Sequence, residues 1–198
     1  MKKIPCLFQR DFTDRRNPRL FESVTPGMEW VIAGEGEATI KLDGTACAVI
    51  GGKLYKRYDA KHGKPAPVDG IPCDEPDLVT GHWPHWIPVG DEPSSKYHRE
   101  AWEGRRSESG EVIIPDGTYE LCGPKFSANP EGLALHTFIR HGEMAVRVIR
   151  TFETLRTFLQ GLRHEGLVFW REPGNVKAPM CKIRRSDFGL PWPIREEG

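Results

Sequence analysis

Apolar side chains follow a strand-like pattern along much of this chain, and they take helical spacing in one segment. Residues 117–122, 133–140, 144–150, 166–170 and 180–184 read as short β-strands. From Phe152 onward, apolar residues recur every three or four positions, and Thr151 is a suitable N-cap for a helix that begins there. These patterns predict an α+β fold of mainly antiparallel sheets with few helices.

The remaining segments differ in how clearly they predict structure. Gly51-Gly52 separates two strand-like runs between Glu37 and Tyr58, which predicts a β-hairpin. Residues 59–111 contain seven prolines and are expected to be the least regular part of the chain. Residues 1–27 are expected to form an irregular N-terminal segment within a single domain that spans residues 1–198.

Composition narrows the class of protein. Lys plus Arg and Asp plus Glu are both 28, so the formal net charge is zero and a generally polybasic nucleic-acid binder is excluded. A hydrophobic fraction of 38% argues against disorder. The five scattered cysteines contain no CxxC pair and predict reduced thiols, mostly in the core. No apolar run approaches the ~20 residues of a membrane span, so a cytoplasmic protein is expected.

The strongest candidate for chemistry is Lys41, which ends a strand-like run and precedes the turn residues Asp43 and Gly44. A strand-end lysine can project its amine into a cleft, and the amine becomes a nucleophile when it is partly desolvated or lies near other cations. Taken alone, this short pattern fits an ordinary solvated lysine equally well.

Further charged residues follow Lys41 in a fixed order. They are Arg57, Glu120, Glu165 and Lys182. Two of them are carboxylates on predicted strands, and Lys182 lies on a basic strand that continues to Arg184. A nucleophile, carboxylates for Mg²⁺ and cations for phosphate groups are the parts that a phosphoryl-transfer site needs.

In order and spacing, these segments resemble the motifs of the covalent nucleotidyltransferases, which comprise ATP-dependent ligases and mRNA-capping guanylyltransferases. The matching segments are Lys41-Leu42-Asp43-Gly44, Arg57, Tyr119-Glu120-Leu121-Cys122-Gly123, His136-Thr137-Phe138, Glu165-Gly166 and Lys182-Ile183-Arg184. The last motif usually reads Lys-x-Lys in the family, and here Arg184 replaces the second lysine. The resemblance implies a nucleotidyltransferase-type, ATP-grasp-like core.

The resemblance also assigns roles to residues. Lys41 would carry the nucleotide, Glu165 would hold Mg²⁺ (or Mn²⁺), and Glu120 would bind the ribose. Catalytic roles fall on Lys41, Glu165 and Lys182. Residues expected to contact the ATP nucleotide are Ile40, Asp43, Gly44, Arg57, Glu120, Phe138, Val168, Lys182 and Arg184. Phe138 would stack on the adenine, with His141 as a rival for that role.

A closer likeness is to a small RNA ligase family that includes a vertebrate 5′-to-3′ RNA ligase. It rests on Gly27–Val31, Thr80–Pro84, Trp86–Val89 and Gly189–Pro193, and extends over roughly residues 20–193. It implies an ATP-dependent RNA ligase that joins 5′-phosphate and 3′-hydroxyl RNA ends, with end-healing enzymes as possible partners. Because 16 residues follow Lys182, no C-terminal OB domain is expected.

Several alternatives remain open at this point. The chain could be a capping-type guanylyltransferase, a DNA ligase, or a catalytically silent RNA-binding module. Phe138 could be a core residue, because an aromatic side chain on an alternating strand usually packs inside. Two weaker interpretations concern the loop region: a zinc site, and stacking of tryptophans on RNA bases. The zinc site would use Cys73, His82, His85 and His98. The stacking tryptophans would be Trp83, Trp86 and Trp102.

Overall fold

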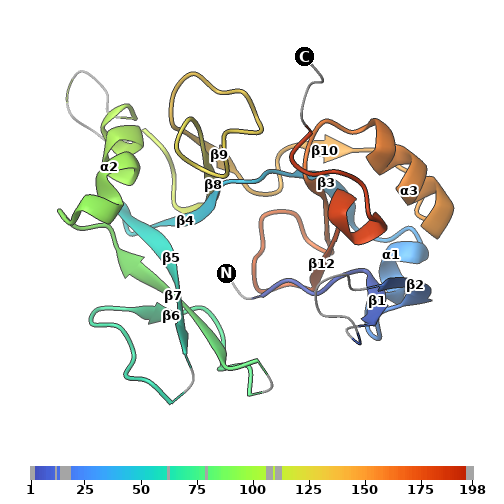
Figure 1. Ribbon diagram of the computed structural model, residues 1–198. Helices are drawn as coiled ribbons and strands as arrows, with labels where there is room; N and C mark the ends of the chain where they lie inside the picture. The colour runs from blue at the N-terminus through green and yellow to red at the C-terminus, as the bar shows by residue number, and fades with distance from the viewer. Residues whose placement is uncertain are drawn as a thin grey trace. The chain divides into compact units, whose positions relative to one another are not determined.

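A computed structural model describes residues 3–11, 13, 19–61, 63–78, 80–105, 109 and 113–194. In its three sheets, every pair of neighbouring strands is antiparallel. The α-helices of the described residues are short: α1 (Glu29–Ile32), α2 (Lys96–Glu103) and α3 (Phe152–Gly161). The expected α+β fold with mainly antiparallel sheets and few helices is therefore confirmed (Figure 1).

The chain divides into two compact units. The Glu120 unit is built mainly from Asp43–His141, and the Lys41 unit from Ile4–Leu42 together with Gly142–Gly198. The single adenylation domain expected over residues 1–198 stays a prediction. Within the described residues, none of the helices has the length and apolar character needed to cross a lipid bilayer.

A four-stranded sheet in the order β10-β3-β11-β12 forms the centre of the Lys41 unit. Its strands are β3 (Glu37–Lys41), β10 (Ala145–Val146), β11 (Gly166–Trp170) and β12 (Met180–Arg184). One face of this sheet packs in an apolar core with Leu155 and Leu159 of α3. The same core includes Leu7 and Phe8 at the start of the β1–β2 pair, which is β1 (Phe8–Asp11) and β2 (Arg19–Val24). A 3₁₀ turn, η2 (Arg185–Phe188), follows β12.

A six-stranded sheet in the order β6-β7-β5-β4-β8-β9 forms the Glu120 unit. The strands are β4 (Thr45–Ile50), β5 (Lys53–Lys61), β6 (Ile71–Pro72), β7 (His82–Pro88), β8 (Gly117–Cys122) and β9 (Thr137–Arg140). A 3₁₀ turn, η1 (Pro93–Ser95), leads into α2. The core residues are Cys47, Val49, Leu54, Ala101, Tyr119, Leu121 and Phe138.

Local sequence signals locate several elements correctly. The Gly51-Gly52 turn joins β4 to β5, and both glycines take positive φ (57° and 71°), which a two-residue hairpin turn requires. Thr151 caps α3, because its hydroxyl accepts a hydrogen bond from the Thr154 backbone N–H, and the Thr154 hydroxyl accepts one from the Thr151 backbone N–H. Strands 117–122, 166–170 and 180–184 form as predicted.

Other segments correct the expectation. Residues 59–111 contain β6, β7, η1 and α2, so this region is more regular than its prolines indicated. Pro84 fits within β7 because its carbonyl accepts a hydrogen bond from Cys73 and its missing N–H costs a single ladder donor. The N-terminal segment, expected to be irregular, contains β1 and β2. The strands expected over 133–140 and 144–150 are shorter, because only β9 and β10 find partners.

The cysteines follow the prediction. Cys6, Cys47, Cys122 and Cys181 are buried thiols, Cys73 is half-buried, and none of the five forms a disulfide.

Candidate functional site

Lys41 ends β3 and makes an ion pair with Glu165 inside the Lys41 unit. Strand register explains the pairing, because Lys41 lies opposite Gly166 of β11 and Glu165 immediately precedes that glycine. The Lys41 Nζ donates to Glu165 Oε2 and also to the Leu42 carbonyl at 3.3 Å. The Lys41 side chain keeps 21% exposure and that of Glu165 10%, so the pair is largely shielded but the amine remains reachable.

Lys41, Gly166 and Arg184 form a row across β3, β11 and β12, since Gly166 lies opposite Lys41 on one side and opposite Arg184 on the other. The Arg184 Nη1 is 3.9 Å from Glu165 Oε1, so the carboxylate lies between two cations. Gly166 is required by close approach, because a Cβ at this position would come within 2.2 Å of the Ile183 carbonyl oxygen. Any larger residue would push β12 away and separate Arg184 from Glu165.

The next row on the same face consists of Thr39, Val168 and Lys182. Side chains two residues apart on a strand share a face, so Lys182 lies on the same face as Arg184, and Val168 on the same face as Gly166. Burial, followed by repulsion from Arg184 and Lys41, lowers the pKa of Lys182 from 10.5 to about 8. The expected residues Lys41, Val168, Lys182 and Arg184 thus share one face of one sheet, and Glu165, just before β11, contacts Lys41 and Arg184 there.

Asp187 supports this face, although nothing in the sequence pattern singled it out. Its side chain is 2% exposed, and it accepts hydrogen bonds from the Arg184 backbone at 2.8 Å, from Arg184 Nη2 at 2.9 Å and from Arg10 Nη1 at 3.2 Å. Burial lowers the pKa of Arg184, but the hydrogen bonds and charge of Asp187, together with the charge of Glu165, leave this pKa above its ordinary value. Burial and then Asp187 raise the pKa of Cys6 to about 11, so its thiol stays protonated and faces Asp187 Oδ2 at 3.8 Å.

Ile40 is the exception among the expected residues of this unit. Its side chain packs against the apolar core, on the opposite face of the sheet from Lys41. Its backbone N–H is also used, in a hydrogen bond to the Met144 carbonyl at 2.9 Å. A packing role therefore explains Ile40, and the predicted nucleotide contact gains no support from its position.

In the Glu120 unit, the candidate residues surround the carboxylate of Glu120 on β8. Oε1 accepts a hydrogen bond from the Gly44 backbone N–H at 3.0 Å, and Oε2 lies 3.0 Å from His141 Nε2. The side chains of Glu120 and His141 are each 14% exposed. A carboxylate has capacity for about four hydrogen bonds, so Glu120 can still accept one from a ligand hydroxyl.

The turn before β4 is held by two carboxylates. The Asp43 backbone N–H donates to Glu131 Oε1 at 3.3 Å, beside the bond from Gly44 to Glu120. Gly44 is needed because a Cβ there would lie 2.3 Å from the Leu121 carbonyl oxygen. The glycine of the Asp-Gly pair therefore lets the turn approach β8 closely enough to reach Glu120.

The two faces of the six-stranded sheet separate Arg57 from Phe138. Cys47 of β4 lies opposite Lys56 of β5 and opposite Tyr119 of β8, so these three side chains share one face of the sheet. The next residues along β5 and β8 are Arg57 and Glu120, and they therefore share the other face. Arg57 is half-buried on that face, where it pairs with Trp86 of β7.

Phe138 lies on the core face and is 6% exposed. Its ring packs edge-on against Tyr119 and Trp102, with centroids 6.1 and 6.4 Å apart. This position favours the core-packing alternative for Phe138, and its stacking on adenine stays a prediction. His141, the rival for that role, is the ring beside Glu120.

Among the other aromatic and histidine candidates, Trp86, His82 and His85 are buried or hydrogen-bonded. Trp86 is buried at 5% exposure. His82 Nδ1 lies 2.6 Å from Asp59 Oδ2, and His85 Nδ1 lies 2.9 Å from the Trp83 carbonyl. Over the described ranges, no group of three or more His, Cys, Asp or Glu side chains is arranged to hold a metal ion.

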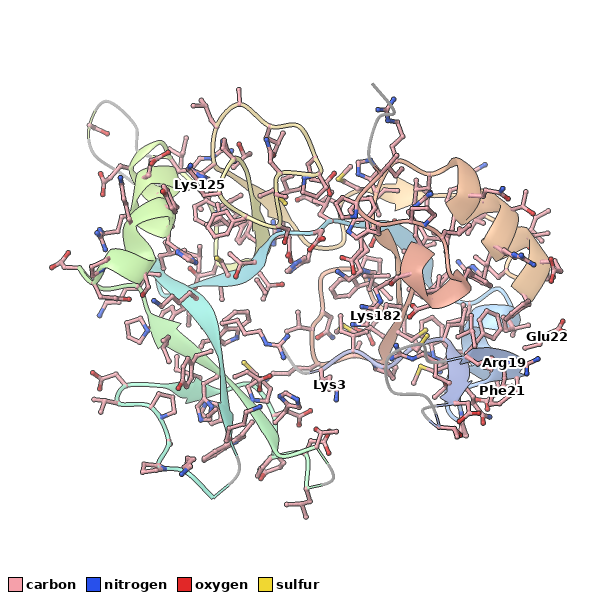
Figure 2. All side chains as sticks on the ribbon, in the orientation of Figure 1. Lys3, Arg19, Phe21, Glu22, Lys125 and Lys182 are labelled. Atoms are coloured by element: carbon pink, nitrogen blue, oxygen red, sulfur yellow. The ribbon has the colours of Figure 1, made fainter. Side chains whose placement is uncertain are left out.

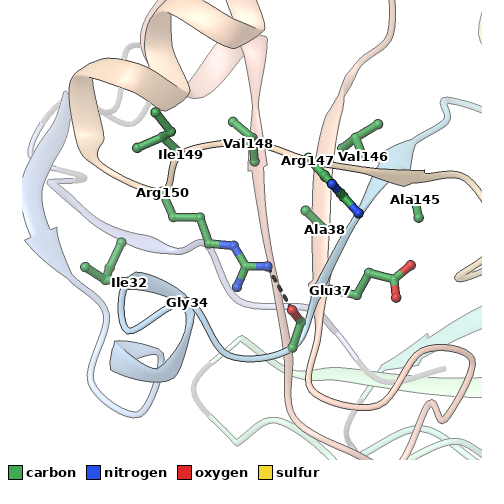
Figure 3. A pocket seen from close by; sticks show the side chains of 11 residues that line it. Ile32, Gly34, Glu37, Ala38, Ala145, Val146, Arg147, Val148, Ile149 and Arg150 are labelled. Atoms are coloured by element: carbon green, nitrogen blue, oxygen red, sulfur yellow. Dashed lines mark hydrogen bonds between the residues drawn. The ribbon is translucent and has the colours of Figure 1, made fainter.

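A cavity of about 690 Å³ in the Lys41 unit lies apart from these residues (Figure 3). It is bordered by β3, β10 and the segment 147–150, and neither Lys41 nor Glu165 lines it. Arg150 points across it to the Gly36 carbonyl at 2.8 Å and also donates to the Glu35 carbonyl. Arg150 therefore holds the backbone that follows α1. The candidate site does not include this cavity.

Sequence reasoning found the charged residues but missed two of their partners. Asp187 carries no motif signal, and its position three residues after Arg184 at a turn was the only available clue. His141 was considered as a stacking ring and not as the partner of Glu120. No protein-family model matches the sequence, and no curated protein shows significant similarity to it.

Proposed function

We propose that this protein is an ATP-dependent RNA ligase that works through a lysyl-AMP intermediate. The observation that carries the proposal is the row of Lys41, Glu165 and Arg184, with Lys182 beside it on the same face. An amine nucleophile, a carboxylate and two further cations in one shielded place are suited to phosphoryl transfer.

Three nucleotidyl-transfer steps make up the proposed reaction. The neutral Lys41 amine attacks the α-phosphorus of ATP, a P–N bond forms, and the bond to the leaving pyrophosphate breaks. The 5′-phosphate of an RNA end then attacks the same phosphorus, which releases Lys41 and forms RNA-adenylate. Finally a 3′-hydroxyl attacks the 5′-phosphate, the phosphodiester forms, and AMP leaves.

Residues of the Lys41 unit would act on the phosphates. Lys182 and Arg184 would neutralise the charge that develops on phosphate oxygens, and Asp187 would hold the Arg184 guanidinium in place. Glu165 stabilises the Lys41 ammonium in the resting protein, so the amine must leave this pair before it can attack.

Glu165 is also the residue that would hold Mg²⁺ or Mn²⁺. Mg²⁺ keeps several waters and is typically bound through one or two carboxylates together with substrate phosphates, so a single carboxylate fits this use. Bound there, the metal would supply positive charge to the phosphates during each transfer.

Residues of the Glu120 unit would act on the nucleoside. Glu120 would accept a hydrogen bond from a ribose hydroxyl, and His141 would keep the carboxylate oriented. The turn at Asp43 and Gly44 would contact the nucleotide through its backbone. Arg57 shares a face with Glu120 and would add a cation for the phosphates.

Nucleotide loading is tested by incubating the protein with ATP and Mg²⁺ and measuring its intact mass. We expect one added AMP, which Lys41→Ala abolishes, because the nucleophile is removed. Lys53→Ala, at an exposed lysine that begins β5, is the matched control and should load normally. An adduct that persists in Lys41→Ala would refute the assignment of the nucleophile.

Substrate choice is tested in the same protein. Label from GTP in place of ATP would indicate a capping-type enzyme, and no label from either would indicate a silent binding module. Joining assays with RNA or DNA strands at low salt separate the two ligase classes, since the 2′-hydroxyl distinguishes RNA from DNA. We expect the all-RNA pair to join; efficient joining of the all-DNA pair would favour a DNA ligase. RNA ends, a cytoplasmic location and end-healing partners belong to this proposal.

A further inference from the structure

A second cavity in the Lys41 unit combines two arginines with an apolar wall. Its volume is about 280 Å³, close to the lower end of the range for small-molecule sites. It is lined by Arg19, Leu20, Phe152, Arg156, Asp187, Phe188 and Gly189. Of these residues only Gly189 falls in a segment that suggested the ligase function, and none of them is among the candidate site residues Lys41, Glu120, Glu165 and Lys182.

The lining of this cavity contains two arginines and one carboxylate. Arg19 and Arg156 are exposed arginines from β2 and α3, and Figure 2 shows Arg19 at the β1–β2 pair. Arg19 has Asp11 opposite it in the register of this pair. Asp187 cannot neutralise either lining arginine fully, because its two oxygens already accept hydrogen bonds from Arg10 and Arg184. The cavity is therefore suited to an anion.

The apolar wall indicates what the anion is attached to. The rings of Phe152 and Phe188 meet edge to face, with centroids 5.1 Å apart, and Leu20 lies beside them. Both rings are half-buried, so part of their surface faces the cavity. A nucleotide carries a phosphate and a flat apolar base on one ribose, and it matches two guanidinium groups next to aromatic side chains.

One carboxylate connects this cavity to the face that holds Lys41. Asp187 lines the cavity and also fixes Arg184, whose guanidinium is 3.9 Å from Glu165. Phosphates repeat along an RNA strand, so a strand with its end at Lys41 presents further phosphates to cations nearby. We propose that this cavity binds one nucleotide of the RNA strand, with its phosphate at Arg19 and Arg156 and its base against Phe152 and Phe188. The proposal rests on the proposed function for the identity of the strand.

RNA binding without ATP tests the site separately from catalysis. Fluorescence anisotropy with a labelled single-stranded RNA of about 12 nucleotides, a length in the range bound by single-strand binders, is measured over a series of salt concentrations. We expect Arg19→Gln with Arg156→Gln to weaken binding about tenfold or more at low salt. The slope of log affinity against log salt should fall by about 0.7 for each phosphate contact removed.

A matched control and a folding check complete the design. Arg147→Gln changes an exposed arginine of the same unit that lines the other cavity, and it should bind RNA as the wild type does. Thermal unfolding identifies any variant that has lost its fold. Because Arg19 and Arg156 are exposed, each single variant should fold and show about half of the change in slope.

The outcomes separate the possible ligands. Unchanged affinity and slope in the double variant would overturn the site. Loss of uridine 5′-monophosphate or inorganic phosphate binding in the double variant, with RNA binding intact, would mean that the site serves a free phosphate compound and not the strand. If the wild type never accepts AMP on Lys41, the ligase proposal fails, while the RNA-binding measurements still decide whether this cavity holds a nucleotide.

Discussion

The two units carry their candidate residues in different electrostatic settings. In the Lys41 unit, charged side chains face one another across adjacent strands, and Glu165 lies between Lys41 and Arg184. In the Glu120 unit, a single carboxylate is held by a backbone N–H and a histidine. The first arrangement concentrates cations that can bind phosphate groups. The second holds one hydrogen-bond acceptor, the Glu120 carboxylate, in one orientation. Under the proposed function, the Lys41 unit would supply the chemistry and the Glu120 unit would supply recognition.

Removing Glu165 should give the largest effect, because its charge would serve every transfer step. We expect Glu165→Gln to slow both AMP loading and the sealing of pre-adenylylated RNA by about 100-fold or more. Glu120→Gln should mainly raise the KM for ATP, since a ribose contact is made before and during reaction alike. Single-turnover rates and ATP titrations distinguish the two patterns. Full sealing by Glu165→Gln, or equal effects of both variants on the sealing step, would contradict the division of roles between the two units.

Replacing Lys182 should raise stability while it lowers activity. Burial disfavours the Lys182 ammonium, and its pKa falls from 10.5 to about 8. Below pH 8 both the folded and the unfolded chain carry this proton, so the folded state bears the full cost of the buried charge. Between pH 8 and 10.5 the unfolded chain binds the extra proton, so the contribution of Lys182 to stability improves as pH rises.

Urea unfolding of Lys182→Met at several pH values measures this cost. The variant should be more stable than the wild type at pH 7, and its advantage should shrink as pH rises from about 8 toward 10.5. Lys177→Met, at an exposed lysine of the same unit, should show no such trend. A stability difference that does not depend on pH would argue that Lys182 is not the titrating group.

The smallest effect is expected at Phe138, and it tests the recognition side of the comparison. Phe138→Leu should lower the free energy of unfolding by about 1 kcal/mol, because it changes the shape of a packed core side chain. The KM for ATP should stay unchanged, whereas His141→Ala should raise it. Tyr58→Leu, at an exposed aromatic residue of β5, controls for the loss of a ring. A large rise in KM with Phe138→Leu would restore the stacking interpretation.

Local chemistry made part of the fold predictable. Thr151 with the apolar spacing after it located α3, and Gly51-Gly52 located a hairpin, because both signals lie within a few residues. Helix α2 was missed because it buries only His98 and Ala101, too few apolar side chains to make a helical stripe. The β1–β2 pair was missed because β2 is mostly exposed, and its sequence therefore lacks the alternation of apolar and polar residues that predicts a strand.

The candidate site shows the same division between local and distant information. The sequence predicted one basic strand that contains Lys182 and Arg184, and the structure places both on β12. Which face Phe138 occupies depends on how β9 registers with β8, and register is a tertiary property that residue type does not reveal. The contacts of Asp187 with Arg10 and of His141 with Glu120 join positions 177 and 21 residues apart, so no local motif contains them.

The division of the chain also has a consequence for the order in which the protein can fold during synthesis. Asp43–His141 is one continuous segment, so the Glu120 unit can begin to form once residue 141 has left the ribosome. Strand β3 must wait longer, because its partners β10 and β11 follow it by more than 100 residues. Until those strands emerge, the backbone edges beside Lys41 lack their partners, and the nascent chain depends on a late and distant segment to protect them.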